Sequence, residues 1–442
     1  MPSSTLTTIR QRLLRELDLG IIIPNAKFDS AASTSITSAD VMRNSRWTTN
    51  HFSQRNTVIY RPGSATAADN IRYAGDLTNS TGTLVHTGAN YSDTTVTSEI
   101  PELWYDGVRA DLEILDAINR ALEFVHFSTF IPISHGGDLD YDMSASTDTN
   151  WTNVGSPSTS AKSTTARRVP YGLRSYQLIN NGVANEGTRS ATLGMGSSRS
   201  VKGFAIASVN VGGASFQLYD VTNAGTTSLL DAVTTSQEEP MLLIQEWQNV
   251  PSTTREIAAN LLGTTTTSDV FWNGLWIYKQ DNLRVNLPSF LNEGFKAPSI
   301  FQGRPKFSVA NHVYDAQSLE MVELKENQDY VYLYDHHNDA NPYAIMVNGP
   351  EAYDWPLFVE ARLPYSHMGV LSAESDATNA PLHLLMPKLK STVLNDIYLP
   401  RNPQNPVWLA KLAEANLQWV EANTARPIKS AAKKPWFSGV RI

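Results

Sequence analysis

The chain has 442 residues and a formal net charge of −8, with 41% hydrophobic and 18% charged residues. This composition is typical of a globular protein, and the net negative charge argues against nucleic-acid binding by the whole molecule. The chain contains no cysteine, which excludes disulfides, zinc–thiolate sites and thiol nucleophiles. A chain of this length is expected to form two to four domains.

The first predicted element is a helix over residues 5–19, in which apolar side chains recur every three or four residues. These side chains are Leu6, Ile9, Leu13 and Leu17, and Gly20 follows as a stop signal. The helix follows Met1 without an apolar signal core, and no run of 18 apolar residues occurs. We therefore expect no secretory signal, no membrane span and synthesis in a reducing compartment.

Residues 30–93 are rich in Ser, Thr, Asn and Gly, and short β-like runs interrupt them. This pattern predicts a small β insertion, residues 21–105, between two helices of a first domain that covers residues 1–130. A long mobile loop is the alternative.

A strongly apolar helix is predicted from Asp106, a good N-cap residue, to Phe127. Steps of three and four residues place six apolar side chains on one face. These are Val108, Leu112, Leu115, Ile118, Leu122 and Val125. Such a helix needs partners to pack against, and the sequence offers other amphipathic helices only near its two ends.

After this helix the sequence changes to short apolar runs separated by turn residues. Regularly spaced short strands predict a β-sandwich of jelly-roll type over residues 131–297. Trp151 stands near its start, and the last strand carries Trp272 and Trp276 after a middle rich in Gly and Asn. This order of elements resembles the sandwiches of carbohydrate-binding modules.

Three aromatic residues of the predicted sandwich could form a platform that stacks on sugars: Trp151, Tyr176 and Trp272. Packing in the core is the favoured alternative, because aromatic side chains bury more area than any others.

A third β-rich segment, residues 298–375, precedes two helices within residues 376–423. Pro387 is expected to kink or split the first of them, and Asn405 with Pro406 forms the start signal of the second. Together with the helices near the N-terminus they would complete one bundle. The predicted fold class is therefore multidomain α+β, a helical bundle built from both chain ends with inserted β domains that include a β-sandwich or jelly roll.

Two groups of acidic and histidine residues could bind a metal. The first combines His135 with Asp138, Asp140 and Asp142, and the second combines His336 and His337 with Asp335 and Asp339. An acidic turn and a solvated loop are the favoured alternatives, because neither spacing fits a known metal site. No phosphate loop or nucleophile elbow occurs. We therefore expect a non-enzymatic protein without metal or cofactor.

The segment of residues 424–442 has two prolines, five cations and no acid. Its expected partner-binding residues are Arg426, Lys429, Lys433, Lys434, Trp436, Phe437, Arg441 and Ile442. A segment of this kind cannot stabilise itself, so it either remains disordered or gains order on a partner. Its aromatic pair and terminal isoleucine favour docking on a partner.

Four stretches of the chain carry a resemblance to a known family: Leu6 to Leu17, Ile118 to Leu122, Phe271 to Pro288, and Pro381 to Leu385. With the basic final segment, these stretches resemble the head–tail connector (neck) adaptor proteins of tailed bacteriophages. The large jelly-roll insertion departs from the minimal helical adaptor.

The resemblance implies a structural virion protein of the neck or tail, made in the cytoplasm of the host bacterium. It further implies a homo-oligomeric ring, usually twelvefold, under the portal protein, with the final segment docked on the portal. A tail, tail-terminator or nozzle protein would lie below, and DNA would pass through the lumen without sequence-specific binding.

Two other classes of protein remain open. One is a phage tail or fibre receptor-binding protein that uses the jelly roll to bind host glycans. The other is a secreted carbohydrate-active enzyme, which should show a catalytic pair that the sequence lacks.

Overall fold

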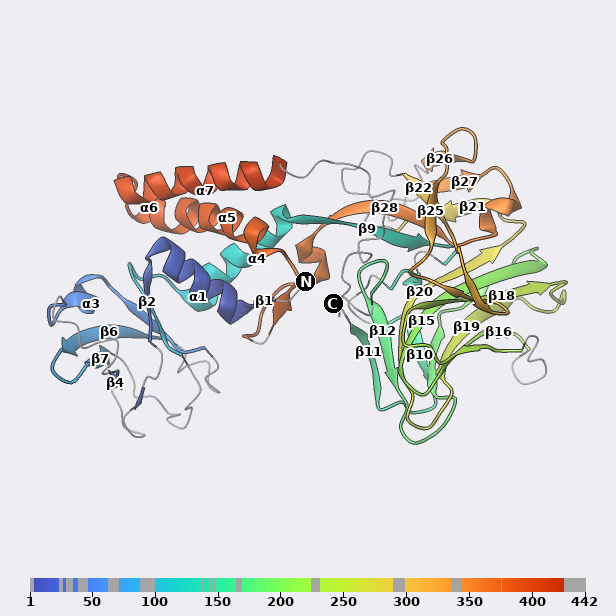
Figure 1. Ribbon diagram of the computed structural model, residues 1–442, viewed down its shortest axis with the longest axis horizontal. Helices are drawn as coiled ribbons and strands as arrows, with labels where there is room; N and C mark the ends of the chain where they lie inside the picture. Colours follow the sequence, from blue (N-terminus) through green and yellow to red (C-terminus); the bar gives the residue numbers. More distant parts are fainter. Residues whose placement is uncertain are drawn as a thin grey trace. The chain divides into compact units, whose positions relative to one another are not determined.

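In the computed structural model the described residues are 4–23, 27–28, 35–38, 47–62, 71–87, 100–136, 139–143, 145, 148–163, 169–223, 231–288, 299–334, 343–374 and 376–424. They form two compact units (Figure 1). The first contains the chain up to Phe127 and again from Pro364, and the second contains Ser128–Leu363. Over the described residues the chain therefore passes between the units twice.

The first helix, α1 (Leu6–Leu17), agrees with the predicted helix at the N-terminus. Thr5 caps it, because its side chain accepts a hydrogen bond from the backbone N–H of Thr8 at 3.2 Å. Asp18 ends it in the left-handed conformation with φ 55°, so Gly20 is not the stop and instead begins the strand β2.

The predicted helix from Asp106 to Phe127 is shorter and less regular than expected. Asp106 has φ 63° and does not cap it. The helical segment begins as a π-helix, η2 (Ala110–Ile114), and continues as α4 (Leu115–Phe124). A π turn adds a residue to the helical repeat and so shifts the apolar stripe. Leu112, predicted to face the core, is 59% exposed.

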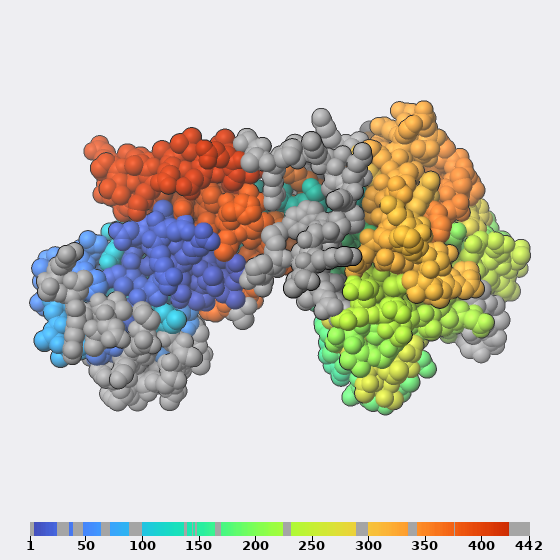
Figure 2. Space-filling model, viewed as in Figure 1, coloured from blue at the N-terminus to red at the C-terminus, as the bar shows by residue number. Residues whose placement is uncertain are grey.

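The chain end contributes α5 (Leu382–Val393), η8 (Leu394–Tyr398), α6 (Leu399–Arg401) and α7 (Pro406–Thr424). Helix α5 runs through Pro387 without being split there. Asn405 caps α7 as predicted, because its Oδ1 accepts hydrogen bonds from the N–H groups of Val407 at 3.0 Å and Trp408 at 3.3 Å. The Lys411 ammonium donates to the carbonyl of Leu17 at 2.6 Å. Figure 2 shows the surface of α7 beside those of α1 and α5 within this unit.

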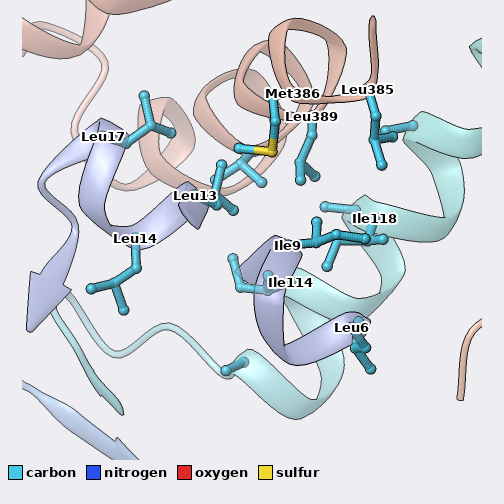
Figure 3. Close-up of a cluster of buried hydrophobic side chains, with 14 of the residues drawn as sticks. Leu6, Ile9, Leu13, Leu14, Leu17, Ile114, Ile118, Leu385, Met386 and Leu389 are labelled. Atoms are coloured by element: carbon cyan, nitrogen blue, oxygen red, sulfur yellow. The ribbon is translucent and has the colours of Figure 1, made fainter. Parts of the chain in front are cut away.

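Helices from both chain segments of the first unit share one apolar cluster (Figure 3). Its buried members on the helices include Leu6, Ile9, Leu13, Leu14, Leu17, Ile114, Ile118, Leu122, Leu385, Met386, Leu389 and Val393. Two of its members, Tyr60 and Trp104, come from strands rather than helices. The helices therefore pack against a sheet as well as against each other.

That sheet has seven antiparallel strands in the order β2-β8-β5-β6-β7-β4-β3. Their bounds are β2 (Gly20–Ile22), β3 (Lys27–Phe28), β4 (Ser35–Thr37), β5 (Val58–Tyr60), β6 (Ile71–Thr78), β7 (Thr83–Thr87) and β8 (Glu102–Trp104). A short helix, α3 (His51–Gln54), precedes β5, and β1 (Ser4–Thr5) pairs with β29 (Ala377–Thr378). A second apolar cluster, which includes Phe52, Ile59, Leu77, Leu84 and Leu103, belongs to this sheet.

The predicted fold class, with a helical bundle as the core, is wrong. Of the described residues 41% lie in strands and 23% in helices, so antiparallel sheets dominate the fold. The amphipathic stripes showed that each helix has one buried face, but they could not show that Tyr60 and Trp104 of the sheet supply part of the partner surface.

The second unit contains two antiparallel sheets that enclose one core. One has the order β10-β13-β19-β16-β17, with β14 also paired to β19, and the other has the order β11-β12-β20-β15-β18-β24-β23. The first sheet comprises β10 (Trp151–Val154), β13 (Gly187–Ser190), β14 (Leu193–Gly194), β16 (Ala214–Asp220), β17 (Val233–Thr235) and β19 (Glu256–Gly263). The second comprises β11 (Thr159–Ser163), β12 (Ser175–Ile179), β15 (Ser200–Val211), β18 (Met241–Gln248), β20 (Asp269–Lys279), β23 (Ser308–Ala310) and β24 (Val313–Asp315). A β-sandwich is thus present, and its second sheet continues past residue 297.

Two smaller sheets, of three and four strands, are also present. The three-stranded sheet has the order β21 (Arg284–Asn286), β27 (Tyr343–Val347) and β26 (Tyr330–Tyr334). The four-stranded sheet has the order β25 (Glu320–Glu323), β22 (Ile300–Arg304), β28 (Leu357–Pro364) and β9 (His126–Ile133). Short 3-10 helices, η6 (Pro350–Tyr353) and η7 (Tyr365–Met368), flank β28. Within the described ranges no helix is long and apolar enough to cross a membrane.

Replacing Leu122 with alanine is expected to lower the free energy of unfolding by about 2–5 kcal/mol, because the side chain is buried in the cluster that α1, α4 and α5 share. Leu112→Ala is the matched control, since Leu112 is exposed on the same helical segment. The free energy of unfolding of Leu112→Ala should change by no more than about 0.5 kcal/mol. Urea unfolding of both variants measures the difference, and equal losses would contradict the assignment of Leu122 to the core.

Candidate functional site

The predicted partner-binding segment falls almost wholly outside the described residues. Only its first residue, Thr424, is described, as the end of α7. The expected partner-binding residues all lie outside the described part of the chain: Arg426, Lys429, Lys433, Lys434, Trp436, Phe437, Arg441 and Ile442. Docking of these residues on a partner stays a prediction.

The three aromatic residues proposed for sugar stacking lie in the core of the sandwich. Trp151 is 7% exposed, and both Tyr176 and Trp272 are fully buried. The rings of Trp151 and Tyr176 lie 5.4 Å apart, and Tyr176 stands opposite Trp272 in the strand register. Stacking on a sugar needs an exposed ring face, which these side chains do not offer in this structure.

Trp151 belongs to a buried polar cluster at the same end of the sandwich. Its indole N–H donates to Asp140 Oδ2 at 3.0 Å, and the ammonium of Lys162 donates to the same oxygen. Burial lowers the pKa of Lys162, although the charge of Asp140 opposes this shift. Asp140 also accepts from the backbone N–H of Ala145 at 2.8 Å, so its carboxylate ties a loop to strands β10 and β11.

The structure does not support the two metal sites considered from the sequence. Among the described residues, no three or more His, Asp or Glu side chains lie close enough together to hold a metal ion. Asp140 is instead engaged by Lys162 and Trp151. His135 accepts a hydrogen bond from the backbone N–H of Lys279 at 2.9 Å, and burial lowers its pKa to about 4. The second group, residues 335–339, and Asp138 of the first lie outside the described residues.

The first unit holds a buried ionic cluster around Arg10 of α1. The guanidinium Nε donates to Glu102 of β8 at 2.6 Å, and its two terminal nitrogens donate to Glu374 at 2.9 Å each. Thr7 and Tyr60 also donate hydrogen bonds to Glu374, and the Arg10 guanidinium lies 4.6 Å from the centre of the Tyr60 ring. Arg10 and Glu374, which are 364 positions apart in the sequence, are thus joined by two parallel hydrogen bonds.

Electrostatics in this cluster follow from burial and from the pairing of charges. Burial raises the pKa of Glu102, and the charge and hydrogen bond of Arg10 oppose the shift. Burial alone would lower the pKa of Arg10, but its two carboxylate partners raise it above the ordinary value. Every charged group here is engaged by another, so the cluster serves to hold segments together rather than to bind a ligand.

The outer face of the sheet β10-β13-β19-β16-β17 carries a polar row that the sequence analysis did not identify. Because side chains alternate along a strand, the neighbours of core residues such as Phe216 point away from the core. The strand registers place Thr152 beside Arg189, Arg189 beside Asn260, and Asn260 beside Gln217. One row of polar side chains therefore crosses four strands.

Within this row the side chain of Arg189 extends across β19. Its Nε donates to Asn260 Oδ1 at 2.9 Å, and its guanidinium carbon lies 4.2 Å from the centre of the Tyr219 ring. Arg189 and Tyr219 belong to the two strands that flank β19, about 10 Å apart. Ala258 stands opposite Tyr219 in the strand between them, and its small side chain is buried.

We name the four residues Arg189, Gln217, Tyr219 and Asn260 the Arg189 face. A guanidinium held on a tyrosine ring is stabilised by cation–π attraction, which fixes both groups. Amide and guanidinium groups beside an aromatic ring provide the hydrogen bonds and apolar contact that a polar organic ligand needs. Arg189, Gln217 and Tyr219 are all half-buried and so present part of their surface to solvent.

No protein-family model and no curated protein sequence matches the chain. Solved structures similar to it include carbohydrate-binding modules and part of a bacteriophage tailspike. The CBM22-1 xylan-binding domain from Paenibacillus barcinonensis Xyn10C is 13% identical, with a TM-score of 0.26 over 34% of this chain and 91% of that domain. TmCBM61, solved in complex with β-1,4-galactotriose, is 8% identical, with a TM-score of 0.24 over 30% of this chain and 91% of that one.

The enzymatically active domain of tailspike protein 4 from bacteriophage CBA120 is 13% identical, with a TM-score of 0.26 over 34% of this chain and 21% of that one. None of the structures named here is a head–tail connector. Because these TM-scores and identities are low, the assignment of a β-sandwich rests on the strands and core of this chain, and the Arg189 face rests on its own geometry.

Replacing Arg10 with alanine is expected to lower the free energy of unfolding by about 3–5 kcal/mol, because it leaves the buried carboxylate of Glu102 without its counter-charge. Arg12→Ala is the matched control. It removes an arginine from the same helix, but the pair that Arg12 forms with Glu16 is exposed and should contribute less than about 1 kcal/mol. Urea unfolding compares the two variants, and a small loss for Arg10→Ala would show that the cluster is not needed for stability.

Proposed function

We propose that this chain is a non-enzymatic tail or fibre protein of a tailed bacteriophage whose β-sandwich binds glycans of the host. The observation that carries the proposal is the Arg189 face, where an aromatic ring and three hydrogen-bonding side chains share the outer side of one sheet. A rigid sheet holds these groups in register, which reduces the entropy lost when a ligand binds.

The position of the face on the sandwich supports binding rather than a role in folding. The core of the sandwich is filled by other residues, among them Trp151, Tyr176 and Trp272, so the Arg189 face is not needed to complete it. Arg189, Gln217 and Tyr219 are half-buried, so part of each side chain is available to a partner. The assignment to a phage tail comes from the pattern of the whole sequence and is part of the proposal.

A second candidate function is the head–tail connector, with a homo-oligomeric ring under the portal and the segment of residues 424–442 docked on it. One observation favours self-association. Leu409, Ala413 and Leu417 follow one another at four-residue steps on the exposed face of α7, and the two leucines are 46% and 65% exposed. The stripe is symmetric about Ala413, so a second copy of α7 lying antiparallel would meet leucine with leucine.

Tyr219→Ala is expected to weaken glycan binding by the full-length protein at least tenfold, about 1.4 kcal/mol, while leaving the melting temperature within about 2 °C. Tyr343→Ala, which removes a partly exposed tyrosine from β27, is the matched control and should bind as the unmodified protein does. Affinity electrophoresis in gels that contain a panel of acidic and neutral polysaccharides provides the measurement. Absence of binding to every polysaccharide would exclude the proposed function.

Leu417→Glu is expected to abolish rings or other oligomers if the connector function holds, because it places a charge in the apolar stripe of α7. Val407→Glu is its control, since Val407 is also exposed but lies on another side of the same helix. Electron microscopy and sedimentation of both variants test this. A monomeric unmodified protein at micromolar concentration would argue against the connector.

A further inference from the structure

We propose that the Arg189 face selects saccharides that carry a carboxylate, such as uronic-acid polymers. This inference rests on the proposed glycan-binding function and specifies the chemical class of its ligand.

The charge balance of the face points to an anionic ligand. The Arg189 guanidinium uses its Nε for Asn260, and within the described part of the chain its two terminal nitrogens form no hydrogen bond and no ion pair. The half-buried Arg189 thus has no carboxylate partner among the described residues, whereas the buried Lys162 of the same sandwich is paired with Asp140. A ligand carboxylate would supply the missing counter-charge.

Two acidic residues on the neighbouring strands β19 and β16 do not fill this role. Glu256 lies four residues before Asn260 on β19 and is exposed, about 13 Å along the strand. Asp220 follows Tyr219, but its side chain is buried and is held by Thr254 at 2.6 Å and Asn223 at 2.9 Å. Neither carboxylate forms an ion pair with Arg189.

The orientation of the guanidinium suits a planar anion. Its Nε donates to Asn260, and its central carbon lies 4.2 Å from the centre of the Tyr219 ring, so two contacts position the group before a ligand arrives. Two terminal N–H groups in one plane match the two oxygens of a carboxylate. The half-buried Tyr219 would then contact the sugar ring that carries the carboxylate.

The test compares acidic and neutral saccharides on the full-length protein. Isothermal titration would use oligosaccharides of galacturonic acid and of galactose, which differ mainly in the carboxylate. Affinity electrophoresis would use polygalacturonate, alginate and hyaluronan against neutral galactan, xylan and glucan. We expect the protein to bind at least one acidic polymer ten or more times more tightly than any neutral polymer, with affinity falling as sodium chloride rises from 50 to 500 mM.

Arg189→Gln should remove the preference for acidic polymers. Arg189→Lys should retain only part of it, because an ammonium cannot bind a carboxylate through two parallel hydrogen bonds. Arg255→Gln is the control, since it removes the same charge from an exposed position just before β19. The melting temperature of each variant reports whether the sandwich is intact.

The outcomes separate the two proposals. Equal affinity for acidic and neutral polymers, or an acidic preference that survives Arg189→Gln in a folded protein, would overturn this inference and leave the proposed glycan binding in place. Failure to bind any polymer in either assay would overturn both.

Discussion

The buried guanidinium of Arg10 is the constraint on which the first unit depends. A charge removed from water is tolerated only where opposite charges and hydrogen bonds replace the solvent, and Arg10 finds them in Glu102 and Glu374. These residues belong to the first helix, to strand β8 and to the segment before α5. The cluster is therefore complete only when all three have reached their positions. Around it, the apolar side chains of α1, α4 and α5 form the core that the helices share with Tyr60 and Trp104.

Local elements of the fold could be predicted where a local signal determined them. The spacing of Leu6, Ile9 and Leu13 gave the helix α1, and Asn405 with Pro406 gave the start of α7. The class of the fold could not be predicted, because an amphipathic stripe shows that a face is buried but not what covers it. The π-helix at residues 110–114 was missed for a related reason: the change of helical repeat that exposes Leu112 leaves no mark in the spacing of apolar residues.

The candidate site was harder to predict than the sandwich that carries it. Aromatic residues are visible in a sequence, but their direction depends on the register of each strand, and Trp151, Tyr176 and Trp272 face inward. Arg189, Tyr219 and Asn260 are separated by 30 or more residues and become neighbours only when β13, β19 and β16 are paired. A one-residue change of register would move each of them to the other face. An alternation of core and polar residues along these strands was the only available signal, and it does not specify which polar side chains meet.

The double passage of the chain between its two units has a consequence for the order of folding during synthesis. The described residues of the second unit, Ser128–Leu363, lie within the sequence of the first, and 364 residues separate Arg10 from Glu374. At 5–20 residues per second, a ribosome needs roughly 20–70 s to cover that distance. During this time α1, β8 and α4 are already made but lack their last partners, while the whole sandwich has emerged and is free to fold. The inserted unit therefore has the opportunity to mature first, and the unit that begins the chain is the last to close.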